Sequence, residues 1–156
     1  MTAHLDAREA AARPTLLVTM HSFTPVYSGN ARPMQAAVLY NRDQRLAQPL
    51  LRLLRAEPGL VVGENEPYSV DDHSDYGINV HGEQRGFPSV EIEIRQDLIA
   101  DAAGQREWVE RLARLLPEAA GKKGQGSALD PPGASRPQTP LALRGFPSPP
   151  RRNQQL

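Results

Sequence analysis

The chain has 156 residues and not one cysteine, so disulfides, thiolate zinc sites and a cysteine nucleophile are all excluded. No apolar stretch approaches the roughly 20 residues that a membrane helix requires. Residues 1–13 are rich in alanine and charged side chains but have no apolar core, so they do not form a secretory signal. These absences predict a cytoplasmic protein without a membrane partner.

The chain also lacks a net charge, but its charges are unevenly divided. Residues 121–156 hold six of the 18 Lys and Arg residues and one acid, Asp130, which leaves this segment at +5 and residues 1–120 at −5. Phosphate binding requires a clustered basic face. The acidic body therefore argues against a nucleic-acid partner.

The composition changes near residue 120. Residues 121–156 contain seven of the fifteen prolines and five of the twelve glycines, with few hydrophobic side chains. Such a segment buries too little apolar surface to offset its ordering entropy, so we expect a disordered Pro/Gly/Arg-rich tail. Residues 147–152 match a P-x-x-P-x-R polyproline ligand, although a chance match is the preferred interpretation. Residues 1–120 suit one domain with a sizeable core.

Within the predicted domain, short apolar runs alternate with stretches of helical period. The runs have the length and bounds of strands buried on both faces, and they lie at 15–20, 36–40 and 60–63. Alternation of strands and helices predicts an α/β fold with a mostly parallel or mixed sheet flanked by helices.

Three helices are expected around this sheet. Residues 5–12 form the first, ended by Pro14. The second begins at an Asp43 N-cap, with Pro49 kinking it or shifting its start. The third stops at Pro117. The apolar faces of the second and third helices are spaced at helical intervals and comprise Leu46, Leu50, Leu53 and Leu54, and Trp108, Leu112 and Leu115.

Residues 89–95 alternate between apolar and charged side chains, so Glu91, Glu93 and Arg95 share one face of a strand. One interpretation is the solvated outer face of an edge strand. The other is a catalytic carboxylate whose pKa a neighbouring charge adjusts. The second is favoured because this strand follows three buried-type strands and precedes a covering helix.

His21 ends a buried-type apolar run, and the carboxyl ends of strands are where α/β folds place their ligands. A histidine there and a carboxylate on a second strand suit a metal-dependent amide hydrolase. A structural histidine is the alternative. His73 and His81 lie in the polar segment 68–87, which is long and without clear periodicity, and therefore favours a functional loop over a solvated connection.

Several motifs, taken in order, resemble the N-formylglutamate amidohydrolase family over about residues 5–116. They are His21-Ser22-Phe23-Thr24-Pro25, Arg32-Pro33, Asn65-Glu66-Pro67-Tyr68, Arg85-Gly86 and Glu91-Ile92-Glu93-Ile94-Arg95-Gln96-Asp97-Leu98. The His-Ser pair and the later Glu-Ile-Arg are more distantly similar to the zinc carboxypeptidase fold.

The resemblance implies zinc-assisted hydrolysis of N-formylglutamate or a similar small N-acyl amino acid. By position His21 is implied as a metal ligand and Glu93 as the general base, with Glu91 the weaker candidate for base. The residues implied to bind the carboxylates or the oxyanion of the substrate are Arg32, Asn65, Tyr68 and Arg95.

Family members carry a longer segment before the first strand, which brings a histidine and an acidic residue as further zinc ligands. Here residues 1–14 precede that strand, so we expect an N-terminally truncated domain that binds zinc weakly and hydrolyses little. Uncovered sheet surface predicts self-association. The alternatives are a catalytically inactive relative that binds a ligand or a protein, and a fragment that does not fold stably alone.

Overall fold

The computed structural model describes residues 1–72 and 76–121. The chain divides into two units, 1–125 and 126–156, and every described residue belongs to the first. The predicted tail from residue 122 onward and its polyproline-like motif lie outside the described residues. Among the residues described, no helix is both long enough and apolar enough to cross a membrane.

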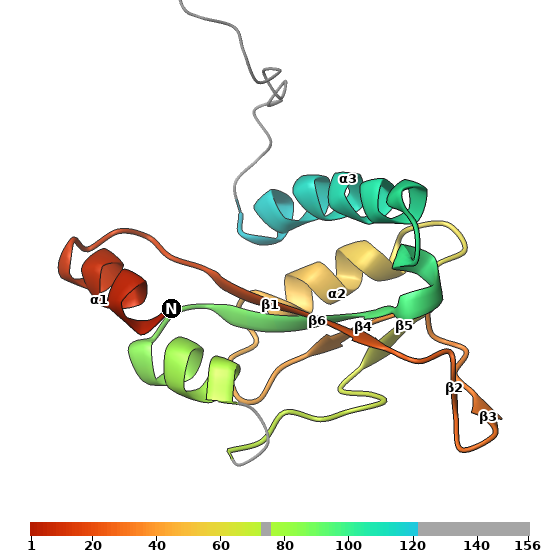
Figure 1. Cartoon of the computed structure of the whole chain (residues 1–156). Coiled ribbons are helices and arrows are strands. Elements are labelled where there is room, and N and C mark those ends of the chain that lie inside the picture. Colours follow the sequence, from red (N-terminus) through yellow and green to blue (C-terminus); the bar gives the residue numbers. More distant parts are fainter. Residues whose placement is uncertain (73–75, 122–156) are drawn as a thin grey trace, which may run out of the picture. The chain divides into compact units, whose positions relative to one another are not determined.

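A four-stranded mixed sheet forms the centre of the first unit (Figure 1). β1 pairs with β6 in parallel and β4 with β5 in parallel, whereas β4 and β6 run antiparallel. In spatial order the strands are β1 (Leu17–Phe23), β6 (Ser89–Arg95), β4 (Ala36–Leu39) and β5 (Val62–Glu64). The predicted α/β class with a mixed sheet is confirmed, and β6 lies inside the sheet, not at its edge.

Two helices, α2 (Ala47–Arg55) and α3 (Ala102–Ala119), cover one face of the sheet (Figure 1). Leu50, Leu54 and Leu115 are almost fully buried between these helices and the strands. Burying a side chain of this size stabilises the fold by about 1.5–3 kcal/mol. The leucine spacing predicted from the sequence therefore produces the main core.

The opposite face of the sheet carries a smaller apolar cluster of Ala37, Leu39, Val70 and Ile78. It is covered by a π-helical turn, η1 (Gly77–Gly82), and a 3₁₀ turn, η2 (Glu83–Arg85). The segment 68–87 is thus partly helical, contrary to the prediction of an irregular loop. Helices of i→i+5 and i→i+3 hydrogen bonding do not repeat every 3.6 residues, so the α-helical pattern could not reveal them.

Two predicted details of the helices that cover the core are wrong. The residue before α2 is Leu46, not Asp43, whose carboxylate instead accepts hydrogen bonds from the backbone and guanidinium of Arg45. Pro49 lies in the first turn of α2, where a missing N–H leaves no bond unmade. It therefore shifts the start of the helix and does not interrupt it.

α3 does not stop at Pro117 but continues to Ala119. The amide of Ala120 donates to the carbonyl of Leu116 at 3.0 Å, so the helical path is kept beyond the proline. At its other end Asp101 is the N-cap and accepts hydrogen bonds from two backbone amides at 3.0 and 2.8 Å. One lost backbone bond near a helix end is a cost that the buried face of α3 offsets.

Three smaller elements complete the unit. α1 (Thr2–Ala10) ends before Pro14, and η3 (Gln96–Ile99) links β6 to α3. A separate hairpin of β2 (Val26–Tyr27) and β3 (Asn30–Ala31) follows β1. Its two loop residues, Ser28 and Gly29, have φ angles of 49° and 79°, as a tight two-residue hairpin turn requires.

Candidate active site

Strand register brings His21, Glu91 and Glu93 to one face of the sheet. In the parallel pair β1–β6, Thr19 lies opposite Glu91 and His21 opposite Glu93. The ligand atoms of the histidine and both glutamates lie within 4.8 Å of one another. His21 and Glu93 therefore converge from neighbouring strands, while their chemical roles stay predictions.

Both glutamates are buried although they alternate with apolar residues. Glu91 is 5% exposed and Glu93 3% exposed, because β6 lies between β1 and β4 and both faces of the sheet are covered. The interpretation of this face as the solvated side of an edge strand is therefore wrong. The side chain of His21, by contrast, is 54% exposed. It lies inside β1, two residues before the strand ends, and not at its end as predicted.

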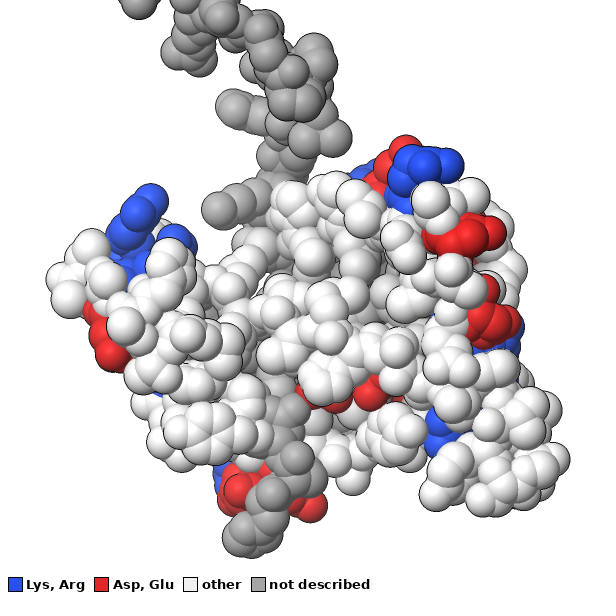
Figure 2. Space-filling model, viewed as in Figure 1, with Lys and Arg blue, Asp and Glu red and all other residues white. Residues whose placement is uncertain are grey.

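The cluster lines an open cavity of about 630 Å³. Its other walls come from the end of β4 and from the segment that follows β5, with Ser22, Leu39, Pro67, Tyr68, Ser69 and Val70 in the lining. In the view of Figure 2, acidic atoms are visible in a recess near the middle of the surface, and most other charged side chains lie toward the margins. A small polar molecule has access to the carboxylates through this opening.

Glu93 has the chemistry of a reactive carboxylate. Burial raises its pKa, while the positive charges of His21 and Arg32 act in the opposite direction. Its Oε2 atom is buried and makes no hydrogen bond. A buried carboxylate oxygen without a partner is costly, so this atom is suited to accept a proton or to contact a cation.

Glu91, the weaker candidate for the base, lies close to the imidazole of His21. Its Oε2 is 3.8 Å from Nε2 of His21 and accepts a hydrogen bond from Oγ1 of Thr19 at 3.4 Å. The alternation of residues along β6 predicts that both glutamates share one face of the strand. It does not predict how far each of them lies from the imidazole. The contact between His21 and Glu91 runs diagonally across the strand pair, because Glu91 lies opposite Thr19.

Arg32 follows the β2–β3 hairpin and is surrounded by three aromatic rings. Its guanidinium carbon is 4.9 Å from the ring centre of Tyr27, 5.3 Å from that of Tyr68 and 5.7 Å from that of Phe23. One guanidinium N–H also donates to the Tyr68 hydroxyl at 3.4 Å. Rings at these distances hold a cation in place, so the guanidinium is positioned where its positive charge acts on Glu93. Tyr68 also lines the cavity.

Of the predicted substrate-binding residues, Tyr68 lines this cavity, and Arg32, Asn65 and Arg95 do not. The Oδ1 atom of Asn65 accepts a hydrogen bond from the backbone N–H of Tyr40 at 2.9 Å. Arg95 pairs with Asp97 at 2.8 Å and donates to the carbonyls of Arg32 and Met34 at 3.3 and 3.4 Å. Both side chains thus hold the backbone around the cavity, and Arg95 supports the loop that carries Arg32.

His81 lies on η1 and is not part of the His21 cluster. It is buried, its ring meets that of Tyr76 edge-on at 5.2 Å, and its Nδ1 makes no hydrogen bond. His73 and Asp75 lie outside the described residues. Among the residues described, the group of His21, Glu91 and Glu93 is the one that brings three metal-binding side chains together.

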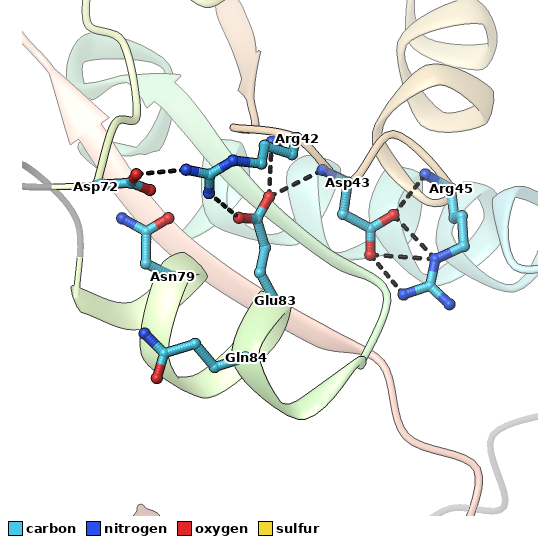
Figure 3. Close-up of a pocket in the computed structure, with 7 residues that line it drawn as sticks. All are labelled: Arg42, Asp43, Arg45, Asp72, Asn79, Glu83 and Gln84. Atoms are coloured by element: carbon cyan, nitrogen blue, oxygen red, sulfur yellow. Dashed lines mark hydrogen bonds and ion pairs between the residues drawn. The ribbon is translucent and has the colours of Figure 1, made fainter.

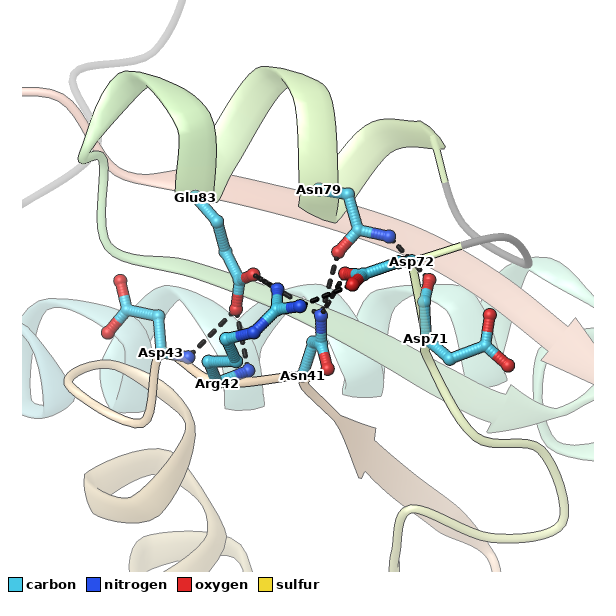
Figure 4. Close-up of polar contacts among 7 residues, drawn as sticks. All are labelled: Asn41, Arg42, Asp43, Asp71, Asp72, Asn79 and Glu83. Carbon is cyan, nitrogen blue, oxygen red and sulfur yellow. Dashed lines mark hydrogen bonds and ion pairs between the residues drawn. The ribbon is translucent and has the colours of Figure 1, made fainter.

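A second cavity, of about 460 Å³, opens between the β4–α2 connection and the η1–η2 segment (Figure 3). It is lined by Arg42, Asp43, Arg45, Asp72, Asn79, Glu83 and Gln84. The carboxylate of Glu83 accepts hydrogen bonds from the backbone amides of Arg42 and Asp43 at 2.6 and 2.8 Å (Figure 4). It also accepts hydrogen bonds from the Arg42 guanidinium at 3.1 Å and from the Asn41 side-chain amide at 3.3 Å. These donors and acceptors satisfy one another's hydrogen bonds. The network, which we call the clamp around Glu83, therefore holds the covering segment to the sheet.

The fold and site together define a mixed α/β domain with a histidine–glutamate cluster in an open cavity. The family model for N-formylglutamate amidohydrolase matches residues 1–100. The chain therefore belongs to the N-formylglutamate amidohydrolase family.

The structure is also similar to the crystal structure of the gene product Atu2144 from Agrobacterium tumefaciens. The two share 35% sequence identity and a TM-score of 0.72, over 77% of this chain and 47% of that one. This chain thus corresponds to about half of that protein. A comparison with curated proteins found no match.

Proposed function

We propose that this domain hydrolyses the amide bond of N-formylglutamate or a similar N-acyl amino acid. The observation that carries the proposal is the buried, unpartnered Glu93 carboxylate facing His21 across neighbouring strands. Membership of the N-formylglutamate amidohydrolase family supports an amide as the bond that is attacked.

The residues present fit a zinc ion. An imidazole nitrogen and carboxylate oxygens are the ligand types that catalytic zinc uses, and the cluster of His21, Glu91 and Glu93 brings such atoms within 4.8 Å of one another. His21 would hold the ion on the exposed side of the cluster. When bound, zinc polarises the amide carbonyl and lowers the pKa of a bound water.

Glu93 acts as the general base in this proposal. Its raised pKa makes its carboxylate a better proton acceptor than an ordinary exposed glutamate. The base works in its ionised form, so hydrolysis declines as pH falls through the raised pKa of Glu93. The protonated carboxyl then returns the proton to the leaving amine.

Arg32 supplies the positive charge for a substrate carboxylate. Its guanidinium is held by the rings of Tyr27 and Tyr68, so little conformational entropy is lost when a carboxylate binds. The Tyr68 hydroxyl lies in the same cavity wall and donates a hydrogen bond to the substrate oxygen. Asn65 and Arg95 contribute by holding the backbone around Arg32 and the cavity.

The test measures formate release from N-formylglutamate by the zinc-loaded chain. We expect Glu93→Gln to lower kcat/KM by about 100-fold or more, because a general base contributes a factor of about 10²–10⁴. Glu110→Gln on the exposed face of α3 is the matched control and keeps wild-type activity. Equal rates in the Glu93→Gln and control variants would exclude the proposed base.

A further inference from the structure

We propose that Glu91 is a second protein ligand of the cation, so that this chain holds the ion through His21 and Glu91 and leaves Glu93 as the base. The inference rests on the proposed function, because it divides the work at that site between two glutamates. It also replaces the expectation, drawn from the sequence, of a single ligand in this chain.

The distance between the two proposed ligands carries the argument. Nε2 of His21 and Oε2 of Glu91 are 3.8 Å apart, which is too long for a hydrogen bond. Two atoms bound to one zinc at about 2.0–2.2 Å each cannot be more than about 4.4 Å apart. A separation of 3.8 Å therefore fits a shared ion without movement of either side chain.

The surroundings of the two glutamates differ in the way that these two roles require. Oε2 of Glu91 accepts a hydrogen bond from Thr19, and metal-binding carboxylates are commonly oriented by such an outer partner. Oε2 of Glu93 is buried and has no hydrogen bond, as suits a base whose partner arrives with the substrate. The proposed base also stays close to the proposed ligands, because the ligand atoms of all three side chains lie within 4.8 Å of one another.

Strand pairing explains why the imidazole of one histidine lies beside both glutamates. In the parallel register Glu91 lies opposite Thr19 and Glu93 opposite His21. The imidazole therefore stands beside two carboxylates spaced two residues apart on the same face of β6. The exposed side of His21 leaves the remaining coordination positions open to water and substrate.

The experiment measures zinc affinity of the full 156-residue chain by calorimetry and the visible absorption of the cobalt(II)-loaded chain. We expect His21→Ala and Glu91→Gln to weaken zinc binding by at least about tenfold and to change the cobalt(II) spectrum. Glu93→Gln should leave both nearly unchanged. Glu66→Gln, an exposed glutamate next to the cavity residue Pro67, is the control for loss of one negative charge.

Each outcome is decisive. Loss of affinity in Glu91→Gln beyond that in Glu66→Gln supports the proposal, and so does a tenfold loss in Glu91→Asp, which keeps the charge but shortens the side chain. Wild-type affinity in Glu91→Gln overturns the inference and leaves the proposed hydrolysis standing. Equal losses in Glu91→Gln and Glu93→Gln overturn the division of roles. No zinc binding by the wild-type chain contradicts both proposals.

Thr19 provides a further check. Thr19→Val removes the hydroxyl that donates to Glu91 and should weaken zinc binding severalfold, whereas Thr19→Ser keeps the hydroxyl and should restore it. A merely structural role for Thr19 would lower the melting temperature of both variants without this difference in affinity. Equal zinc affinities in the Val and Ser variants would count against Thr19 as a positioning residue for Glu91.

Discussion

At the scale of single residues, the cluster buries a carboxyl group in surroundings that disfavour its ionised form. The carboxyl of Glu93 is almost fully buried, and burial raises its pKa. The protein therefore carries a cost in folding whenever this carboxylate is ionised and no cation is bound. Sites that retain such a cost are commonly functional, because the same environment makes the group reactive.

This cost predicts that Glu93→Gln stabilises the metal-free protein at pH values above the raised pKa of Glu93. Between its ordinary pKa and the raised folded value, Glu93 binds more protons in the folded than in the unfolded state, so stability falls as pH rises through that window. Above the window the variant should gain on the order of 1 kcal/mol in free energy of unfolding. Below it the difference should vanish, because the wild-type carboxyl is then neutral in both states.

Urea unfolding in the presence of a chelator, at several pH values, measures this effect. Glu110→Gln on α3 should show no such pH-dependent gain, since its side chain is exposed. A free energy of unfolding that shows no gain from Glu93→Gln at any pH in the series would contradict the prediction.

At the scale of elements, the clamp around Glu83 joins η1 and η2 to the connection between β4 and α2 (Figure 4). Asn79 of η1 also donates to the carbonyl of Asp71, next to Val70 in the wall of the candidate site. The clamp therefore holds the wall of the cavity indirectly.

Removing the clamp should loosen that wall. We expect Glu83→Ala to lower the free energy of unfolding by about 1–3 kcal/mol, because two backbone amides lose their acceptor. Amide hydrogen exchange should accelerate in 66–72 and 76–85. Gln84→Ala, an exposed neighbour, is the control and should change neither quantity. Unchanged exchange in 66–72 would show that the wall is held by its apolar contacts alone.

Close packing between η1 and β6 gives a second prediction for these elements. A Cβ atom added at Gly82 would lie 2.5 Å from Oγ and 2.6 Å from Cβ of Ser89. Gly82→Ala should therefore cost about 1–3 kcal/mol, because the turn must move off the sheet. Thermal unfolding measures the loss, and Gly82→Ala combined with Ser89→Gly should recover part of it. A lack of recovery would mean that another contact limits the space.

At the scale of the whole molecule, the chain corresponds to 47% of the Agrobacterium tumefaciens structure that it resembles. β1 forms one edge of the sheet, and Leu16 and Met20 are 42% and 49% exposed there. An unpaired strand edge that carries apolar side chains favours association with another chain. This edge is therefore where we expect the self-association that the sequence predicts.

We expect the protein to associate at high concentration and Met20→Lys to weaken that association, because a lysine on an edge strand opposes pairing. Sedimentation velocity over a range of concentrations measures it. Val109→Lys, at a more exposed apolar position on α3, is the control and should behave as the wild type. A monodisperse monomer at high concentration would contradict the prediction.

The alternation along β6 and the two leucine-rich helices could be predicted from the sequence, because side-chain direction and helical period depend on neighbouring residues alone. The sequence also determined the ordered motifs that indicate the family, including His21 and Glu93. Which groups those residues contact depends on the tertiary structure. Whether β6 lies at an edge or inside the sheet depends on long-range strand pairing.

The same pairing brought Glu91 to His21 and left Arg95 and Asn65 holding backbone groups instead of lining the cavity. No local pattern contains this information, because the distance between two side chains on different strands is set by register. The chemistry of the individual residues is thus readable along the chain. Their assembly into a site is a property of the folded sheet.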